Sequence, residues 1–319
     1  MDAFADIQKL TIQAPRGLGE LVVSYQHFGQ DTATHPVIMI NHALTGDAQV
    51  TGANGWWNKL VGPKQTIDTE QYAIISFNIP GNGVLDSQLD SYTEYHTADI
   101  ATIFREGLRQ LGIHKLYALV GGSIGGCIGW EFMVQYGDLV KRFIPIATDW
   151  KATDWLIANT YLQDQILKNS SKPVHDARIH AMLCYRTPES LAYRFQRTLN
   201  KDEDLFNVET WLRHHGDKLS KRFTHQSYLT VNHLLRSVNS ERNGESLAEV
   251  LKDSQTAFYL IGIDTDLFFT PHQIKQTYED LKMVGITISY SEINSIHGHD
   301  AFLIEYEQMD AILKPIFND

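Results

Sequence analysis

The chain has 319 residues, of which 43% are hydrophobic and 20% are charged. These proportions argue against long disordered segments, and the length fits one large α/β domain with an insertion or two small domains. Because 38 acidic residues outnumber 27 Lys and Arg and leave a formal charge of −11, we expect neither a nucleic-acid partner nor an anionic membrane surface.

Nothing in the sequence predicts export or membrane insertion. Residues 1–6 are acidic and lack the basic and apolar regions of a signal peptide. No apolar run approaches the length of a transmembrane helix. The two cysteines, Cys127 and Cys184, predict neither a disulfide framework nor a metal site. We therefore expect a cytoplasmic protein without a metal or a permanently bound cofactor.

The first third of the chain alternates strand-like segments with polar turns. Residues 20–28 alternate apolar and polar side chains, as a half-buried strand does. Residues 37–40 and 72–77 are continuous apolar runs, typical of strands buried on both faces. The first of these leads directly into Asn41-His42-Ala43-Leu44-Thr45-Gly46-Asp47. Further along, apolar residues at three- and four-residue steps predict a helix over 100–111.

The glycine-rich turn that comes next carries the most informative motif. A strand-like run over 116–120 leads into Gly121-Gly122-Ser123-Ile124-Gly125-Gly126, and a helix-like segment then continues to near Gly137. This is a G-x-S-x-G nucleophile elbow in its strand–turn–helix setting. Small neighbours let the strand and helix approach, while the serine takes strained backbone angles. We predict that Ser123 is a nucleophile; the alternative is a glycine-rich turn that only packs tightly.

The strand–helix alternation stops after a further strand at 143–147. From about 154 to 250 the pattern is nearly all helical, without strands of the buried type. The alternation then resumes, with a strand at 256–262, a helix at 271–283, a strand at 286–290 and a last amphipathic helix over 302–316.

This order of elements predicts an α/β fold with a mostly parallel sheet, helices on both faces and an inserted helical cap. We place the core at residues 1–150 and 251–319 and the cap at residues 151–250. An insertion at this point lies over the carboxyl ends of the strands, where open α/β sheets bind their ligands.

A serine is a poor nucleophile at neutral pH, so it needs a base that a carboxylate orients. In chains with this elbow the order is serine, then the acid, then histidine. Asp264 and Asp266 follow the strand at 256–262, and we favour Asp266 as the acid. His297 and His299 lie in the loop that opens the last helix, and we favour His299 as the base.

Two backbone N–H groups should form the oxyanion hole. One belongs to Ile124, directly after the nucleophile, and the natural second donor is Leu44, in the loop after the strand at 37–40. We assign His42, in the same loop, no role in proton transfer.

Four blocks of this sequence resemble the homoserine O-acetyltransferase family, an acyl-transferring branch of the α/β-hydrolase fold. The matches span nearly the whole chain, and the first and last blocks are specific to that family. They are Asn41–Asp47, similar to H-A-L-T-G-D; Gly62-Pro63 with Ile67-Asp68-Thr69, similar to G-P-G-x-x-I-D-T; Gly121–Gly126, similar to G-G-S-M-G-G with Ile124 in place of methionine; and Gly298–Leu303, similar to G-H-D-x-F-L.

The resemblance implies a ping-pong reaction. Ser123 would take an acetyl group from acetyl-CoA and release the thiol. The γ-hydroxyl of L-homoserine, deprotonated by His299, would then attack the acyl-enzyme. Asp266 matches the family's acid. The resemblance also implies a place in methionine biosynthesis and a homodimer formed through the helical cap.

The resemblance further implies three substrate-binding residues. Arg178 matches an arginine that holds the amino-acid carboxylate, Asp300 an aspartate near the substrate ammonium, and Tyr185 a tyrosine of the pocket. A bidentate arginine suits a carboxylate. The sequence pattern alone would instead place Arg178 on a solvated face of a cap helix.

Two segments depart from the family pattern. Pro80-Gly81-Asn82-Gly83-Val84-Leu85 replaces a G-G-C-x-G-S-T-G-P type segment, and the stretch between the elbow helix and Arg178 is shorter. We therefore keep two alternatives open. One is a related acyltransferase that uses succinyl-CoA or accepts serine, and the other is an esterase or thioesterase with water as the acceptor.

Overall fold

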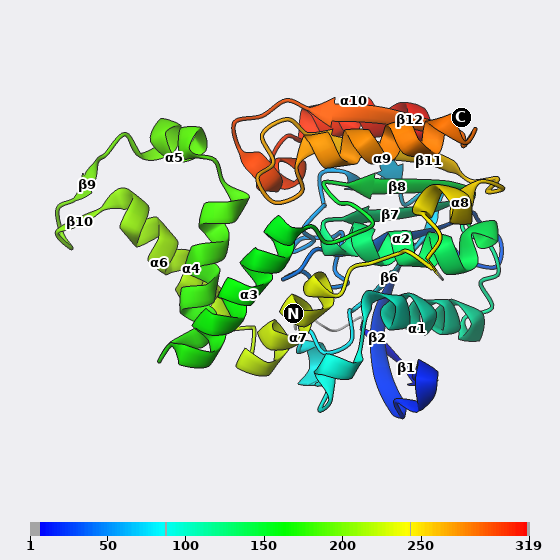
Figure 1. The fold of residues 1–319 in the computed structure, drawn as a ribbon, viewed down its shortest axis with the longest axis horizontal. Helices are drawn as coiled ribbons and strands as arrows, with labels where there is room; N and C mark the ends of the chain where they lie inside the picture. Colours follow the sequence, from blue (N-terminus) through cyan, green and yellow to red (C-terminus); the bar gives the residue numbers. More distant parts are fainter. Residues whose placement is uncertain (1–6, 87, 243, 318–319) are drawn as a thin grey trace.

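The computed structural model describes residues 7–86, 88–242 and 244–317, so the acidic segment 1–6 lies outside the described residues. Within them, an eight-stranded sheet forms the centre of the molecule (Figure 1). All neighbours pair in parallel except the first three strands, which pair antiparallel. Across the sheet the strands are β1 (Gln8–Gln13), β2 (Glu20–Gly29), β6 (Ala73–Phe77), β3 (Val37–Asn41), β7 (Ala118–Gly122), β8 (Arg142–Ile146), β11 (Ala257–Ile263) and β12 (Ile288–Ile293).

Helices cover both faces of this sheet (Figure 1). Along β3, Met39 packs into one buried cluster and Ile38 and Ile40 pack into another, on the opposite face. This alternation explains why the strand is a continuous apolar run. The predicted α/β fold is confirmed. The helices α1 (Thr97–Gln110), α2 (Ile124–Tyr136) and α9 (Pro271–Met283) contribute to the first cluster, and α10 (Tyr306–Phe317) contributes to the second.

The last helix differs from its prediction. It begins at Tyr306, and Phe302 lies instead in a separate 3-10 helix, η5 (Gly298–Leu303). The expected single helix from 302 was therefore wrong. The side chain of Phe302 is buried, and its carbonyl accepts a hydrogen bond from Trp57 Nε1 at 3.2 Å. Trp57 is 245 residues away in sequence, and Tyr306 N donates to Ile304 O instead of making the helical bond to Phe302 O.

The chain between β8 and β11 forms a layer of helices beyond the carboxyl ends of the strands (Figure 1). Its two ends are paired, since Ala152 N donates to Val238 O at 2.9 Å and Ser240 N donates to Trp150 O at 3.1 Å. The division at residues 150 and 250 stays a prediction. The helices are α3 (Asp154–Asn169), α4 (Pro173–Tyr185), α5 (Pro188–Phe195), α6 (Asn207–Ser220) and α7 (His225–Arg236), and the short α8 (Leu247–Leu251) follows them.

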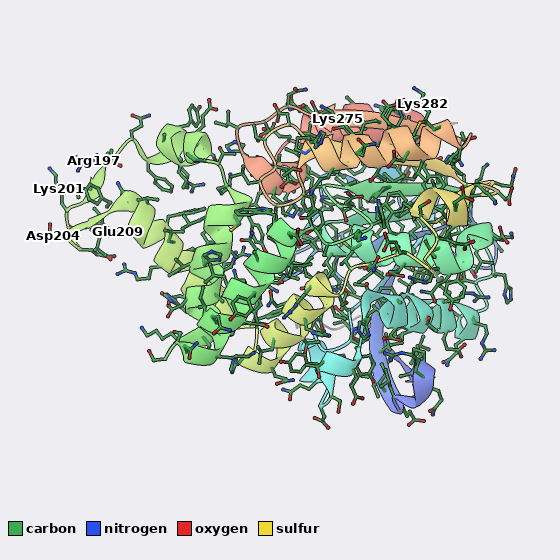
Figure 2. The ribbon with its side chains drawn as sticks, viewed as in Figure 1. Arg197, Lys201, Asp204, Glu209, Lys275 and Lys282 are labelled. Carbon is green, nitrogen blue, oxygen red and sulfur yellow. The ribbon has the colours of Figure 1, made fainter. Side chains whose placement is uncertain are left out.

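The outer end of this cap projects away from the sheet. It consists of α5, α6 and a small hairpin, β9 (Leu199–Asn200) with β10 (Leu205–Phe206). Arg197, Lys201 and Asp204 surround the hairpin and point away from the body of the molecule (Figure 2). Every helix in the described part of the chain is too short or too polar to cross a lipid bilayer.

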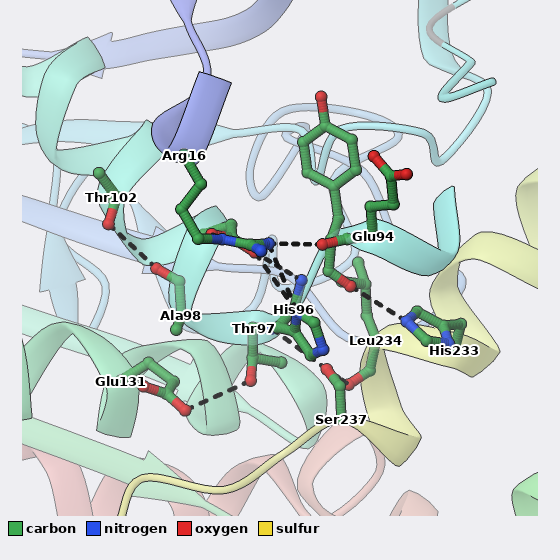
Figure 3. Close-up of polar contacts among 12 residues, drawn as sticks. Arg16, Glu94, His96, Thr97, Ala98, Thr102, Glu131, His233, Leu234 and Ser237 are labelled. Carbon is green, nitrogen blue, oxygen red and sulfur yellow. Dashed lines mark hydrogen bonds and ion pairs between the residues drawn. The ribbon is translucent and has the colours of Figure 1, made fainter. Parts of the chain in front are cut away.

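A polar network anchors the cap helix α7 on the start of α1 (Figure 3). The backbone N–H of Thr97 donates to Ser237 Oγ at 3.2 Å. The His233 Nε2 atom, on α7, lies 3.1 Å from the carbonyl oxygen of Tyr95, just before α1. Because these bonds join segments far apart in sequence, they hold the cap in register with the core.

A buried carboxylate lies just beyond β8. Asp149 is only 7% exposed, and its Oδ1 accepts hydrogen bonds from Trp150 N and Thr277 Oγ1, each at 2.9 Å. Burial raises the pKa of Asp149 to about 7, although these two hydrogen bonds oppose the shift. Between about pH 4 and about pH 7, the folded protein therefore retains a proton on Asp149 that the unfolded chain releases.

This proton makes a testable contribution to stability. The unfolded carboxyl ionises near pH 4, so between about pH 4 and about pH 7 this group lowers the free energy of unfolding by roughly 1.4 kcal/mol per pH unit as pH rises. The Asp149→Asn variant removes this dependence while it keeps the side chain's shape. We expect the variant to gain stability over the wild type from pH 5 to pH 8 in urea unfolding. Parallel curves for the two proteins would refute this assignment.

Candidate active site

Ser123 lies at the turn between β7 and α2 with strained backbone angles, φ 55° and ψ −128°. A non-glycine residue with positive φ is costly and persists only where its surroundings enforce it. The enforcing contact is visible at Gly125, where an added Cβ would lie 2.5 Å from the carbonyl oxygen of Asn41. The first turn of α2 thus touches the backbone at the end of β3.

Three side chains from separate loops meet at this turn. Ser123 Oγ lies 2.9 Å from His299 Nε2, and His299 Nδ1 lies 2.7 Å from Asp266 Oδ2. Because a carboxylate only accepts, the imidazole proton belongs on Nδ1, and Nε2 is free to accept the serine proton. Ser123 and His299 are each 4% exposed and Asp266 is 2% exposed. This is the arrangement that activates a serine for nucleophilic attack.

The carboxylate of Asp266 is itself held in place. Its Oδ1 accepts hydrogen bonds from the backbone N–H groups of Phe268 at 2.7 Å and Phe269 at 3.0 Å. Burial alone would lower the pKa of His299, but the charge and hydrogen bond of Asp266 outweigh it and the pKa is raised. The buried carboxylate thus favours the protonated, imidazolium form of His299.

The two alternative residues lie elsewhere. Asp264 is exposed, and its Oδ1 accepts the backbone N–H of Ser295 at 2.9 Å, which closes the loop before His297. The His297 Nδ1 atom lies 2.9 Å from Ser190 Oγ, on the cap. The tertiary structure thus places Asp266 and His299 beside Ser123.

The two expected oxyanion donors come from adjacent segments. Asn41 Nδ2 donates to Gly125 O at 3.1 Å and so ties the loop that carries Leu44 to the first turn of α2. Ile124 is the first residue of that helix, whose first N–H groups lack intrahelical acceptors. Within the described residues, neither the N–H of Leu44 nor that of Ile124 donates a hydrogen bond. Both are thus available to a developing oxyanion.

His42 stabilises the loop after β3 that carries Leu44. It is fully buried, and its Nδ1 donates to the carbonyl of Ala43 at 2.8 Å. Its Nε2 accepts the backbone N–H of Ile79 at 3.0 Å. Burial lowers the pKa of His42, which favours the neutral ring that these two bonds require.

Of the three predicted substrate-binding residues, Tyr185 contacts His299 from the cap, Arg178 lies beside Tyr185, and Asp300 directly follows His299. The Tyr185 ring lies 5.5 Å from the His299 ring, and the Arg178 guanidinium lies 5.6 Å from the Tyr185 ring. Among the described residues, no carboxylate pairs with Arg178. Asp300, in contrast, forms an ion pair with Arg186 at 3.1 Å. Arg186 carries no predicted role, although it directly follows Tyr185 in the sequence.

A small cavity lies between the cap and the site. Residues of α3, α4 and α7 form its walls, and Leu44 and Phe268 border it on the side of the core. The cavity is lined by Leu44, Asn159, Thr160, Gln163, Ala181, Cys184, Tyr185, Tyr228, Asn232, Leu235 and Phe268.

Within the described ranges no cluster of three His, Cys, Asp or Glu side chains could hold a metal ion.

The chain is similar to known proteins over most of its length. Residues 36–284 match the model of the alpha/beta hydrolase fold. Homoserine O-acetyltransferase of Carboxydothermus hydrogenoformans is 31% identical over 96% of this chain and 92% of its own length. The chain belongs to the homoserine O-acetyltransferase family. It is accordingly an enzyme.

Solved structures share the fold over the full length of this family member. Homoserine O-acetyltransferase from Bacillus anthracis superposes with a TM-score of 0.86 at 19% identity, covering 98% of this chain and 97% of that one. Esterase E22 superposes with a TM-score of 0.83 at 17% identity, covering 97% and 98%. Acyltransferases and esterases thus share this fold, and the chemistry has to be argued from the site.

The two loop aspartates provide a matched test of the geometry. We expect Asp266→Asn to lower kcat by about a hundredfold or more, because the amide can no longer hold the Nδ1–H tautomer or balance the imidazolium. Asp264→Asn serves as the control two residues away, and we expect it to retain most of the activity. The measurement is acyl-CoA turnover with both variants confirmed as folded. A larger loss in Asp264→Asn would assign the acid role to Asp264.

Proposed function

We propose that this enzyme transfers an acetyl group from acetyl-CoA to the γ-hydroxyl of L-homoserine through an acyl-enzyme on Ser123. One observation carries the proposal: the line of hydrogen bonds from Asp266 through His299 to Ser123 lies buried beneath a helical cap. Membership of the homoserine O-acetyltransferase family supports the acceptor.

In the first half-reaction, His299 Nε2 takes the proton of Ser123 as Oγ attacks the thioester carbonyl. The N–H groups of Leu44 and Ile124 stabilise the oxyanion. The carbon–sulfur bond then breaks, and His299 returns its proton to the departing thiol. Asp266 stabilises the imidazolium throughout, since its carboxylate lies 2.7 Å from His299 Nδ1.

In the second half-reaction, His299 takes the proton of the homoserine hydroxyl, whose oxygen attacks the acyl group. The ester bond to Ser123 Oγ then breaks, and His299 returns the proton to that oxygen. Arg178 holds the acceptor's carboxylate and Asp300 attracts its ammonium, while the ring of Tyr185 lies close to both Arg178 and His299. Arg178 suits this role because it carries a guanidinium without an acidic partner among the described residues.

Burial of the reacting groups supports transfer over hydrolysis. An acyl-enzyme survives until the acceptor arrives only where water is excluded. Ser123 and His299 are each 4% exposed, and the cap helix α4 packs the ring of Tyr185 directly over His299. A wide open groove would instead favour an esterase with water as the acceptor.

We further propose a cytoplasmic homodimer that functions in methionine biosynthesis and binds its acyl-CoA only as a substrate. Large apolar rings that face solvent on the cap support the dimer. They are Trp155, which is 53% exposed, Tyr161, which is 56% exposed, and Tyr193, which is 71% exposed. Such rings are enriched where proteins associate.

The acceptor can be tested by the release of free thiol from acetyl-CoA. We expect rapid release that continues over many turnovers with L-homoserine. Without an amino-acid acceptor we expect little beyond one equivalent of thiol, because the buried acyl-enzyme excludes water. L-Serine and succinyl-CoA serve as the comparison acceptor and donor. Full-rate release without any acceptor would identify a thioesterase instead.

Arg178 can be tested through the acceptor's Michaelis constant. In Arg178→Lys we expect the KM for homoserine to rise by about tenfold or more, since an ammonium cannot make the bidentate contact of a guanidinium. The first half-reaction, measured as thiol exchange into acetyl-CoA, should stay near the wild-type rate. Arg213→Lys is the matched control, because Arg213 is an exposed arginine paired with Glu203 on the cap. An unchanged homoserine KM would return Arg178 to a solvated surface role.

A further inference from the structure

The short link between α4 and α5 touches the turn that carries His299. Tyr185 places its ring 5.5 Å from the His299 ring. Thr187 Oγ1 donates to the carbonyl of Ile296 at 2.5 Å. The fit is so close that a Cβ added to Gly298 would lie 3.0 Å from the carbonyl oxygen of Tyr185. This segment of the cap is therefore packed directly on the turn 296–300.

Arg186, the middle residue of this link, makes the charged contact with the turn. Its side chain is 12% exposed, and its Nε lies 3.1 Å from Asp300 Oδ2. Its Nη1 lies 3.3 Å from Ser190 Oγ and 3.1 Å from His297 Nδ1. The guanidinium centre lies 5.9 Å from the Trp211 ring of α6. Arg186 thus joins two cap helices to the turn on both sides of His299.

The two arginines of the site differ in their partners. Arg186 is paired with Asp300, whereas the described residues offer Arg178 the Tyr185 ring and no carboxylate. Asp300 therefore meets an incoming ammonium with one side already occupied by a cation. The direction from which Arg186 approaches decides which part of the carboxylate remains for a ligand.

We propose that Arg186 is a positioning residue that holds Asp300 through this ion pair, and so sets both the charge felt by the His299 base and the place where the acceptor's amino group binds. The second part of this inference rests on the proposed function. The first part depends only on the pairing of Ser123 with His299.

The sign of the effect follows from the groups around the base. The carboxylates of Asp266 and Asp300 both raise the pKa of His299, against the burial that lowers it. From α4, the Tyr185 ring packs on His299, with Arg178 beyond it. Because Arg186 Nε lies 3.1 Å from Asp300 Oδ2, we expect its positive charge to offset the effect of that carboxylate on His299. On the same turn, the groups that act on the pKa of His297 are Arg186, Glu305, Asp300 and Arg194.

Removing either partner should therefore move the base in opposite directions. Arg186→Gln leaves Asp300 without its cation, so the pKa of His299 should rise. Asp300→Asn removes the carboxylate, so the pKa should fall. Arg186→Lys keeps the charge and should stay near the wild type. A residue that only stabilised the fold would not produce shifts of opposite sign.

The readout for this part is the labelling of Ser123 by phenylmethanesulfonyl fluoride, followed by mass spectrometry across pH. This labelling requires a neutral His299, and it proceeds without any amino-acid acceptor. We expect the midpoint of the acid limb to move to higher pH in Arg186→Gln and to lower pH in Asp300→Asn. Arg194→Gln is the matched control: it removes an exposed arginine on α5 that stacks on Trp211 and Phe195. We expect no shift there.

The second readout is the steady-state KM for homoserine. We expect Arg186→Gln to raise it by about tenfold, the size of one charge-assisted contact, and Arg186→Lys to raise it less. If the wild-type enzyme releases thiol at a rate that does not depend on homoserine, the proposed function is wrong. The labelling experiment would still test the effect of Arg186 on His299.

Either of two results would overturn the inference. One is an acid limb that moves in the same direction, or not at all, in Arg186→Gln and Asp300→Asn. The other is a homoserine KM that changes as little in Arg186→Gln as in Arg194→Gln. Thermal unfolding of each variant identifies misfolding. If Arg186→Gln does not fold, a missing downward shift in Asp300→Asn overturns the inference equally.

Discussion

The close approach of two backbone segments at the nucleophile elbow is the constraint on which the site depends. The first turn of α2 lies against the end of β3 so tightly that no side chain fits at Gly125, and Asn41 bonds across the contact to the carbonyl of that glycine. This packing holds Ser123 in a backbone conformation that it would otherwise avoid. It also ties the start of the loop that carries Leu44 to the helix that begins at Ile124. One steric contact therefore connects the turn at Ser123 with both of the segments that we propose as oxyanion donors.

His299 reaches this elbow from the other end of the chain. Because it is buried, the charges of neighbouring side chains act on it strongly. His299 Nδ1 bonds to Asp266 Oδ2, and the other oxygen of that carboxylate accepts hydrogen bonds from two backbone N–H groups. Electrostatic interactions are strong in such an enclosed place. A second carboxylate on the same turn, Asp300, would add to the negative charge if the cap did not supply Arg186. The cap thus takes part in the electrostatics of the site as well as in covering it.

Local patterns predicted the core well because each of its elements signals itself over a few residues. The apolar runs at 37–40 and 72–77 correspond to β3 and β6, and the helix predicted at 271–283 has the same bounds as α9. Two elements escaped this reasoning. The edge strand β1 has the mixed sequence Gln-Lys-Leu-Thr-Ile-Gln and is stabilised by its pairing with β2. The other is the break before α10, where the carbonyl of Phe302 accepts a hydrogen bond from the distant Trp57.

The sequence by itself determined the α/β architecture, the elbow around Ser123 and the order of serine, acid and histidine, because these depend on short motifs and on hydrophobic periodicity. The sequence could not separate Asp264 from Asp266 as the acid, or His297 from His299 as the base, since residues two apart in a loop share one local environment. Only the tertiary structure separated them, by burying one member of each pair next to Ser123 and turning the other toward the loop or the cap. The pairing of Arg186 with Asp300 was decided in the same way. An ion pair between distant segments depends on how the cap packs on the core, and no spacing along the chain encodes that contact.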